Sequence, residues 1–184
     1  MTMDRLARVG ALAVLVVLWL AVPARAADTA TLDDFIGSYV GKSITGDSTK
    51  GLSPRDLSVT ITREKSGFVL TWTTMKQRDD GTMARKSYRI AFQPTRRDGI
   101  YASAMRSDKF GARIPLNPMQ GEPYVWARLH GRTMTVYALH IQDDGTYEMQ
   151  VYDRTLIDGG LDLTFTRLRE GQPYRVVHGI LTRQ

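Results

Sequence analysis

Histidine is the side chain whose charge changes closest to neutral pH, and the sequence contains three: His130, His140 and His178. No two of them have the i, i+2 or i, i+4 spacing that brings metal ligands together, and there is no cysteine. A common metal site is therefore not predicted. His130 falls in a glycine turn and should be exposed, whereas His140 and His178 fall in predicted strands, where hydrogen-bonded core histidines are the simplest interpretation.

The motifs that prepare a catalytic nucleophile or hold a phosphate are also missing from the sequence. No Gly-x-Ser-x-Gly segment is present, and glycine-rich phosphate loops are absent. Adjacent aspartates occur at Asp33-Asp34, Asp79-Asp80 and Asp143-Asp144, where they should point into water rather than act as an acid–base pair. These residues favour binding over catalysis, and no catalytic residue is predicted.

Aromatic and methionine side chains mixed with a few polar groups suit a site for an apolar small molecule. Alternation along the strands described below favours six residues as the lining of such a site. The alternative interpretation is that the same side chains simply fill a narrow core. The predicted ligand-binding residues are Tyr39, Trp72, Tyr88, Trp126, Tyr137 and Met149.

Short runs of alternating apolar and polar residues, each ended by a glycine-containing turn, predict β-strands that would position these side chains. Asp-Gly turns supply the positive φ of tight hairpins, so strands adjacent in sequence should pair. The predicted fold is all-β: an antiparallel up-and-down barrel of about ten strands, with a sandwich as the alternative. The predicted strands are Ile36–Thr45, Leu57–Arg63, Phe68–Lys76, Lys86–Gln93, Ile100–Met105, Tyr124–Leu129, Met134–Ile141, Tyr147–Arg154, Leu161–Leu168 and Arg175–Leu181.

The predicted core follows from the side chains that point inward at every second position of a strand. Two runs, Tyr124–Leu129 and Met134–Ile141, are apolar on both faces, and the sequence leaves open which face looks inward. We expect the segment Arg106–Pro123 to fold over that wall or over the barrel mouth, with a subunit interface as the alternative. The predicted core residues are Leu57, Val59, Ile61, Phe68, Leu70, Trp72, Tyr88, Ile90, Phe92, Leu161, Leu163 and Phe165.

The first 26 residues have the organisation of a secretory signal peptide. Arg5 and Arg8 precede an apolar run from Ala11 to Val22, which is followed by a small-x-small cleavage pattern ending at Ala26. This run is shorter than the roughly 20 residues of a membrane span. We predict cleavage after residue 26, a periplasmic or secreted location without stable membrane insertion, and a single barrel domain over 27–184.

The charged residues do not indicate a nucleic-acid-binding protein. The formal net charge is +6, but lysine and arginine are scattered singly or in pairs such as Arg96-Arg97 rather than gathered in a run. Without cysteine, an exported chain has neither disulfides nor a thiol nucleophile, so its stability must come from its core.

The stretch Gly37-Ser38-Tyr39 resembles the Gly-x-Trp motif on the first strand of the calycins, the lipocalin and fatty-acid-binding superfamily. Here tyrosine replaces the tryptophan. The resemblance implies a short helix before this strand, for which Thr31-Leu32-Asp33-Asp34 offers a cap, and an arginine packed over Tyr39, for which Arg175 and Arg183 are candidates. About ten strands and the C-terminal segment around His178 resemble nitrobindin-like haem barrels more distantly, which implies His178 as a haem ligand.

The predicted function is therefore non-enzymatic binding of a small hydrophobic ligand, lipid or pigment-like, by an exported barrel without a cofactor. One alternative is an envelope interaction module with a filled barrel, acting as a homodimer or with an envelope protein. Another alternative is a haem-binding barrel that uses His178.

Overall fold

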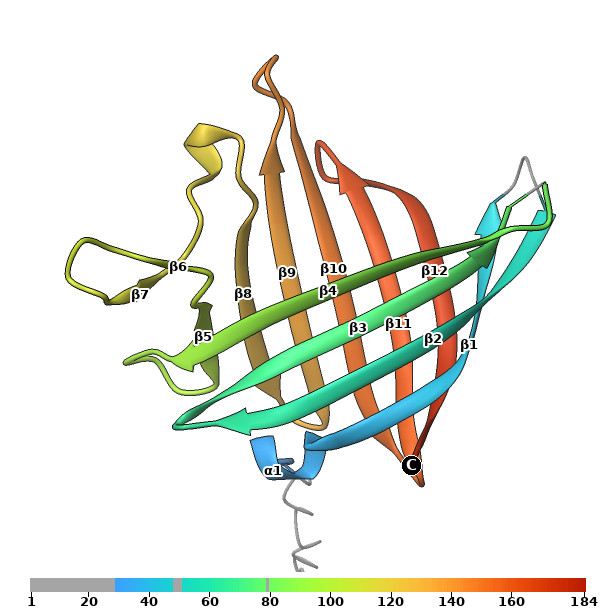
Figure 1. Cartoon of the computed structure of the whole chain (residues 1–184), viewed down its shortest axis with the longest axis horizontal. Helices are drawn as coiled ribbons and strands as arrows, with labels where there is room; N and C mark the ends of the chain where they lie inside the picture. The colour runs from blue at the N-terminus through green and yellow to red at the C-terminus, as the bar shows by residue number, and fades with distance from the viewer. Residues whose placement is uncertain (1–28, 48–50, 79) are drawn as a thin grey trace, which may run out of the picture.

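The computed structural model describes residues 29–47, 51–78 and 80–184. Within these residues ten antiparallel strands close into a barrel in the order β1-β12-β11-β10-β9-β8-β5-β4-β3-β2, with β2 paired to β1 (Figure 1). The predicted up-and-down barrel is confirmed. The elements are α1 Leu32–Phe35, β1 Gly37–Asp47, β2 Gly51–Glu64, β3 Gly67–Gln77, β4 Met83–Pro94, β5 Ile100–Ser103, β6 Arg106–Ser107, β7 Arg113–Ile114, η1 Pro118–Gln120, β8 Tyr124–His130, β9 Thr133–Ile141, β10 Tyr147–Ile157, β11 Gly160–Arg169 and β12 Gln172–Arg183.

Each predicted strand is present, with ends that differ by a few residues. The predicted signal peptide, residues 1–26, lies outside the described residues and stays a prediction. In the described part of the chain, no helix has the length and apolar character needed to cross a membrane.

One end of the barrel is closed by α1 and Tyr39. The Thr31 amide and hydroxyl both donate to the Asp34 carboxylate, at 2.7 and 2.9 Å, so the predicted cap of the helical turn is confirmed. Tyr39 is fully buried, and its hydroxyl donates to the Phe35 carbonyl at 2.9 Å. The Arg183 guanidinium lies 5.1 Å from the centre of the Tyr39 ring. Of the two arginines expected over Tyr39, it is therefore Arg183 that packs there.

The interior of the barrel contains most of the predicted core; Tyr88 is the exception and is 47% exposed. Val59, Ile61, Phe68, Leu70 and Phe92 are buried in one cluster with residues of β8, β9, β11 and β12. The predicted core residues Leu57, Trp72 and Ile90 pack against this cluster and are partly buried. Alternation on β2, β3, β4 and β11 was therefore sufficient to identify their inward faces.

The inward faces of the two doubly apolar strands are Val125, Ala127 and Leu129 on β8 and Met134, Val136 and Ala138 on β9. Trp126 and Tyr137 alternate with these residues and therefore lie on the outer face, directly opposite each other in the β8–β9 register. Their rings stack at 4.8 Å.

The segment between β5 and β8 covers the outer wall only in part. η1 packs beside β9, as expected. The β6–β7 hairpin instead extends away from the barrel (Figure 1), and Phe110 at its tip is exposed. The expectation that this whole segment covers the wall or the mouth is therefore wrong for the hairpin.

Gly41 marks a close approach between β1 and β12, where a side chain has no room. A Cβ on Gly41 would lie 2.0 Å from the Ile180 carbonyl oxygen, and Gly41 is paired with Leu181 in the barrel ladder. Because two paired backbones would have to separate, we expect Gly41→Ala to lower the free energy of unfolding by about 1–3 kcal/mol in urea denaturation. Val40→Ala, at the exposed neighbouring position, is the control and should change stability by less than about 0.5 kcal/mol. Equal stability of both variants would contradict the close approach.

Candidate functional site

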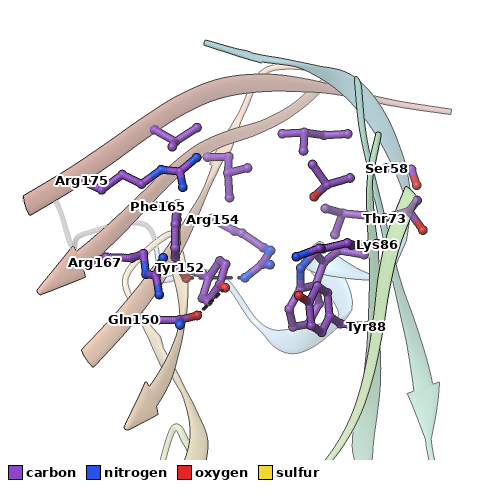
Figure 2. A pocket seen from close by; sticks show the side chains of 16 residues that line it. Ser58, Thr73, Lys86, Tyr88, Gln150, Tyr152, Arg154, Phe165, Arg167 and Arg175 are labelled. Carbon is purple, nitrogen blue, oxygen red and sulfur yellow. Dashed lines mark hydrogen bonds between the residues drawn. The ribbon is translucent and has the colours of Figure 1, made fainter. Parts of the chain in front are cut away.

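A cavity of about 310 Å³ lies inside the barrel, between β2–β4 on one side and β10–β12 on the other (Figure 2). Four of its side chains are aromatic: Trp72, Tyr88, Tyr152 and Phe165. Four others are cationic: Lys86, Arg154, Arg167 and Arg175. The remaining lining residues are Leu57, Ser58, Val59, Thr73, Thr74, Gln150, Leu163 and Val177.

The aromatic walls follow directly from the strand register. Trp72 and Tyr88 face each other on β3 and β4, and Tyr152 and Phe165 face each other on β10 and β11. The first pair of rings stacks at 5.0 Å and the second at 4.5 Å. Trp72 also reaches Tyr152 across the barrel, at 5.5 Å between ring centres. The two walls therefore meet and form an aromatic floor for the cavity.

Arg154 lies between these walls, as Figure 2 shows, and is only 1% exposed. Its guanidinium is 5.8 Å from the Trp72 ring centre and 5.6 Å from that of Tyr152. Among the described residues its Nε has no hydrogen-bond partner, and Nη1 has a long contact of 3.5 Å to the Tyr152 carbonyl. Burial lowers the pKa of Arg154 to about 10, which leaves the side chain charged at neutral pH. No carboxylate of the described residues forms an ion pair with it.

Arg175 resembles Arg154 in one respect. Its Nε is also buried without a hydrogen-bond partner, and its side chain points toward the cavity from β12 (Figure 2). Unsatisfied buried donors are uncommon in folded proteins and call for an explanation at each occurrence. Two such donors line the same cavity.

Arg167, in contrast, is neutralised by Glu148. The Glu148 carboxylate accepts hydrogen bonds from Arg167 Nε at 3.0 Å and Nη2 at 2.6 Å, and also from the Tyr174 hydroxyl and Gln150 Nε2. Burial raises the pKa of Glu148, but the hydrogen bonds from Tyr174, Gln150 and Arg167 outweigh it and lower the pKa to about 2. The Tyr152 hydroxyl donates to Gln150 Oε1 at 2.9 Å, which connects this network to the cavity wall.

A second hollow is lined by His140, Glu148, Arg167 and Arg169 and shares Gln150 and Arg167 with the cavity. Burial lowers the pKa of His140, which favours the neutral imidazole near neutral pH. His140 is thus the one predicted core histidine that lies beside the cavity entrance. No group of three or more potential metal ligands occurs among the described residues.

The structure brings together two of the six predicted ligand-binding residues, Trp72 and Tyr88, in the wall of the cavity. Tyr39 belongs to the core that closes the other end of the barrel. Trp126, Tyr137 and Met149 lie on the outer face, because Met149 is opposite Leu139, two residues after Tyr137 on the same side of β9. An interior position for these three residues is therefore wrong.

His178 is exposed on the outer face of β12, where its Nδ1 lies 3.2 Å from the Thr164 hydroxyl. The inward neighbour is Val177, and the cavity lining contains no histidine. A haem inside the barrel requires an axial ligand that points inward. Because its side chain lies on the outer face, His178 does not fit the role of axial ligand to a haem in the cavity.

Sequence reasoning missed Arg154, Tyr152, Arg167 and Arg175. Arg154 and Tyr152 lie on β10, whose polar residues face the interior against the usual pattern, whereas Arg167 continues the inward-facing set of β11. The signal that could have found them is the hairpin at Asp158-Gly159, which places Leu156, Arg154 and Tyr152 opposite the inward-facing Leu161, Leu163 and Phe165.

Comparison with known proteins adds little to this description. No protein-family model matches the chain, and a search of curated proteins finds no match. Among solved structures, the chain is similar to Rv2717c from M. tuberculosis, at 13% identity and a TM-score of 0.49, over 85% of this chain and 99% of that one. It is also similar to the S-type phycobiliprotein lyase CPES from Guillardia theta, at 8% identity and a TM-score of 0.38, over 83% and 90% of the two chains. Both TM-scores are low and carry no functional argument.

Proposed function

We propose that this protein is an exported, non-enzymatic barrel that binds a small amphipathic anion, with the apolar part of the ligand against the aromatic walls and its acidic group at Arg154. The observation that carries this proposal is the buried guanidinium of Arg154 in the cavity, which has no ion pair with the described residues and whose Nε has no hydrogen-bond partner among them. The predicted hydrophobic ligand is thereby refined to one that also has a negative charge.

The charge balance of the cavity supports an anionic ligand. Burial of a charged group without a partner is unfavourable, and a buried arginine is normally paired. Of the three arginines in the lining, Glu148 pairs only with Arg167. A ligand carboxylate would accept a charge-assisted hydrogen bond from Nε of Arg154. It would also compensate the buried positive charge of this side chain.

The size and remaining chemistry of the cavity support a compact ligand and a binding role. A volume of about 310 Å³ is at the lower end of the range for small-molecule sites, which favours one short chain or a small ring system. The cavity lining in the described part of the chain has tyrosines, hydroxyls and cations but no carboxylate, imidazole or thiol. Such a lining favours holding a ligand over general acid–base or nucleophilic chemistry. Export is part of the proposal and rests on the signal-peptide pattern of residues 1–26.

The test compares matched acids and alcohols by calorimetry on the chain from Ala27: octanoate with octanol, and naphthoate with naphthol. Because a hydrogen bond to a charged group is the stronger kind, at least one acid should bind about tenfold more tightly than its alcohol. Trp72→Ala should weaken this binding by about tenfold, since Trp72 forms the wall. Trp126→Ala is the matched control, because Trp126 is also stacked on a tyrosine but lies outside. Equal affinity for acid and alcohol, or no binding of either pair, would contradict the proposed function.

A further inference from the structure

The segment between β5 and β8 displays two apolar side chains to solvent. Phe110, at the tip of the β6–β7 hairpin, is 94% exposed, and Met119, in η1, is 79% exposed. Every other large apolar side chain of the described residues is less exposed than these two. Figure 1 shows the hairpin and η1 on the same side of the barrel, with η1 at the end opposite α1. Exposure of this much apolar surface to water is unfavourable, and the next most exposed large apolar side chain of the described residues, Ile180, reaches only 56%.

The turn that carries Phe110 is held in place by Asp108. Asp108 Oδ1 accepts hydrogen bonds from the amides of Phe110 and Ala112, both at 2.8 Å. The Asp108 amide donates to the Ala112 carbonyl at 2.8 Å, and Gly111 has a φ of +80°. The side chain of Phe110 is therefore presented by a well-formed turn.

The turn that carries Met119 is built in a similar way. Asn117 Oδ1 accepts from the Met119 amide at 3.0 Å, and the Glu122 carboxylate accepts from the Asn117 amide at 2.9 Å. Glu122 also forms an ion pair with Arg106. Both apolar tips thus stand on turns whose backbone groups are already satisfied, which lowers the entropic loss when the tips become buried.

The charges next to the tips favour an anionic partner. Asp108 keeps its negative charge, because its hydrogen bonds go to two neutral backbone amides, whereas Glu122 is paired with Arg106, so the segment 105–123 carries one net positive charge. Lys109, adjacent to Phe110, forms no ion pair with the described residues, and Arg113 donates to the Ala104 carbonyl, which leaves its charge uncompensated. The segment therefore combines protruding apolar tips with a surplus of positive charge.

We propose that Phe110 and Met119 dock this barrel on an anionic lipid membrane by inserting at the boundary between headgroups and acyl chains. Single apolar side chains on separate convex tips suit a lipid surface, which needs no complementary shape, better than a protein pocket. Tyr124, the first residue of β8, is exposed and contacts Trp126, which adds the kind of aromatic pair that favours the membrane interface. Docking does not depend on the ligand of the cavity, although it would bring the barrel to a source of amphipathic anions.

The test is co-sedimentation of the chain from Ala27, which contains every barrel element, with vesicles of phosphatidylcholine and phosphatidylglycerol in equal parts. The double variant Phe110→Ser with Met119→Ser should bind about tenfold or more weakly, because two apolar anchors are lost. The matched control is Met83→Ser with Ile180→Ser, which removes two exposed apolar side chains from β4 and β12. This control variant should bind like the wild type. In a second measurement, the Trp emission that Phe110→Trp adds should shift to the blue with these vesicles.

Three outcomes would overturn membrane docking by these tips. The first is a wild type that does not sediment with vesicles, and the second is equal binding of the two double variants. The third is binding that vanishes in high salt and is unaffected by the Phe110 and Met119 changes, which would indicate attraction by charge alone. A stable complex of the wild type with a protein, lost in the tip variant while vesicle binding is absent, would assign the tips to a protein partner instead.

Discussion

Arg154→Met is expected to stabilise the barrel and at the same time to abolish preferential binding of an acid over its alcohol. The guanidinium is buried without a carboxylate partner, and the effective penalty for desolvating an ion is several kcal/mol. Its contacts with the Trp72 and Tyr152 rings offset part of this penalty, at about 0.5–2 kcal/mol each. Methionine replaces the side chain as far as about Nε and carries no charge, so the free energy of unfolding should rise by about 1–4 kcal/mol.

Urea denaturation and the acid–alcohol comparison measure the two effects on the same variant. The control is Arg167→Met, which removes a paired guanidinium and leaves Glu148 without its ion partner, and which should therefore destabilise the barrel. A gain in stability together with a loss of acid preference would assign Arg154 to ligand binding. A destabilised Arg154→Met protein that still prefers the acid would show that Arg154 has a structural role instead.

The sequence was sufficient to predict the barrel because strand alternation and turn residues both indicate the same fold. Alternation on β2, β3, β4 and β11 identifies the inward residues, and glycine turns such as Asp158-Gly159 connect strands that pair in space. The closing strand pair is signalled by Gly41, where close approach of β12 leaves no room for a side chain. These features depend on contacts close in sequence or on backbone sterics, which a pattern can reveal.

The site was predicted less well, because its interior does not follow the rule that polar residues face out. On β10 the set Tyr147, Met149 and Val151 is more apolar than the alternating set Gln150, Tyr152 and Arg154, yet the second set points inward. The inward face of β10 follows from its pairing with β11. Phe165 and Leu163 face the core, so their partners Tyr152 and Arg154 must also face inward. A polar inward face on one strand of a barrel is thus a signal of a ligand site that single-strand periodicity cannot show.

The outer aromatic residues illustrate the same difficulty in reverse. On β8 and β9 both faces are apolar, so alternation, on which the prediction of Trp126 and Tyr137 as lining residues rests, cannot tell which face looks inward. The smaller residues Val125, Ala127 and Ala138 take the inner positions. In a barrel whose centre is already occupied by Phe68, Phe92 and the other aromatic rings, small side chains on the facing strands preserve close packing.

Glu148→Gln is expected to lower the free energy of unfolding at neutral pH by about 3 kcal/mol. The carboxylate is held by Arg167, Tyr174 and Gln150, and its pKa falls from 4.5 to about 2. Each unit of pKa difference between the folded and unfolded chain corresponds to about 1.4 kcal/mol. Because the folded-state pKa is lowered, this stabilisation is fully present above about pH 4.5 and is lost as the pH falls from there toward 2.

Urea denaturation of the wild type and Glu148→Gln as a function of pH isolates this group, because the other carboxylates titrate in both proteins. The difference in stability should be largest near neutral pH and should disappear near pH 2. A difference that stays constant over the whole range would mean that the change acts through shape rather than charge. The variant also releases Arg167 from its only ion partner among the described residues, at the edge of the cavity. A lower stability with a severalfold higher affinity for the acid probe would therefore show that Glu148 sets how much positive charge the cavity offers to its ligand.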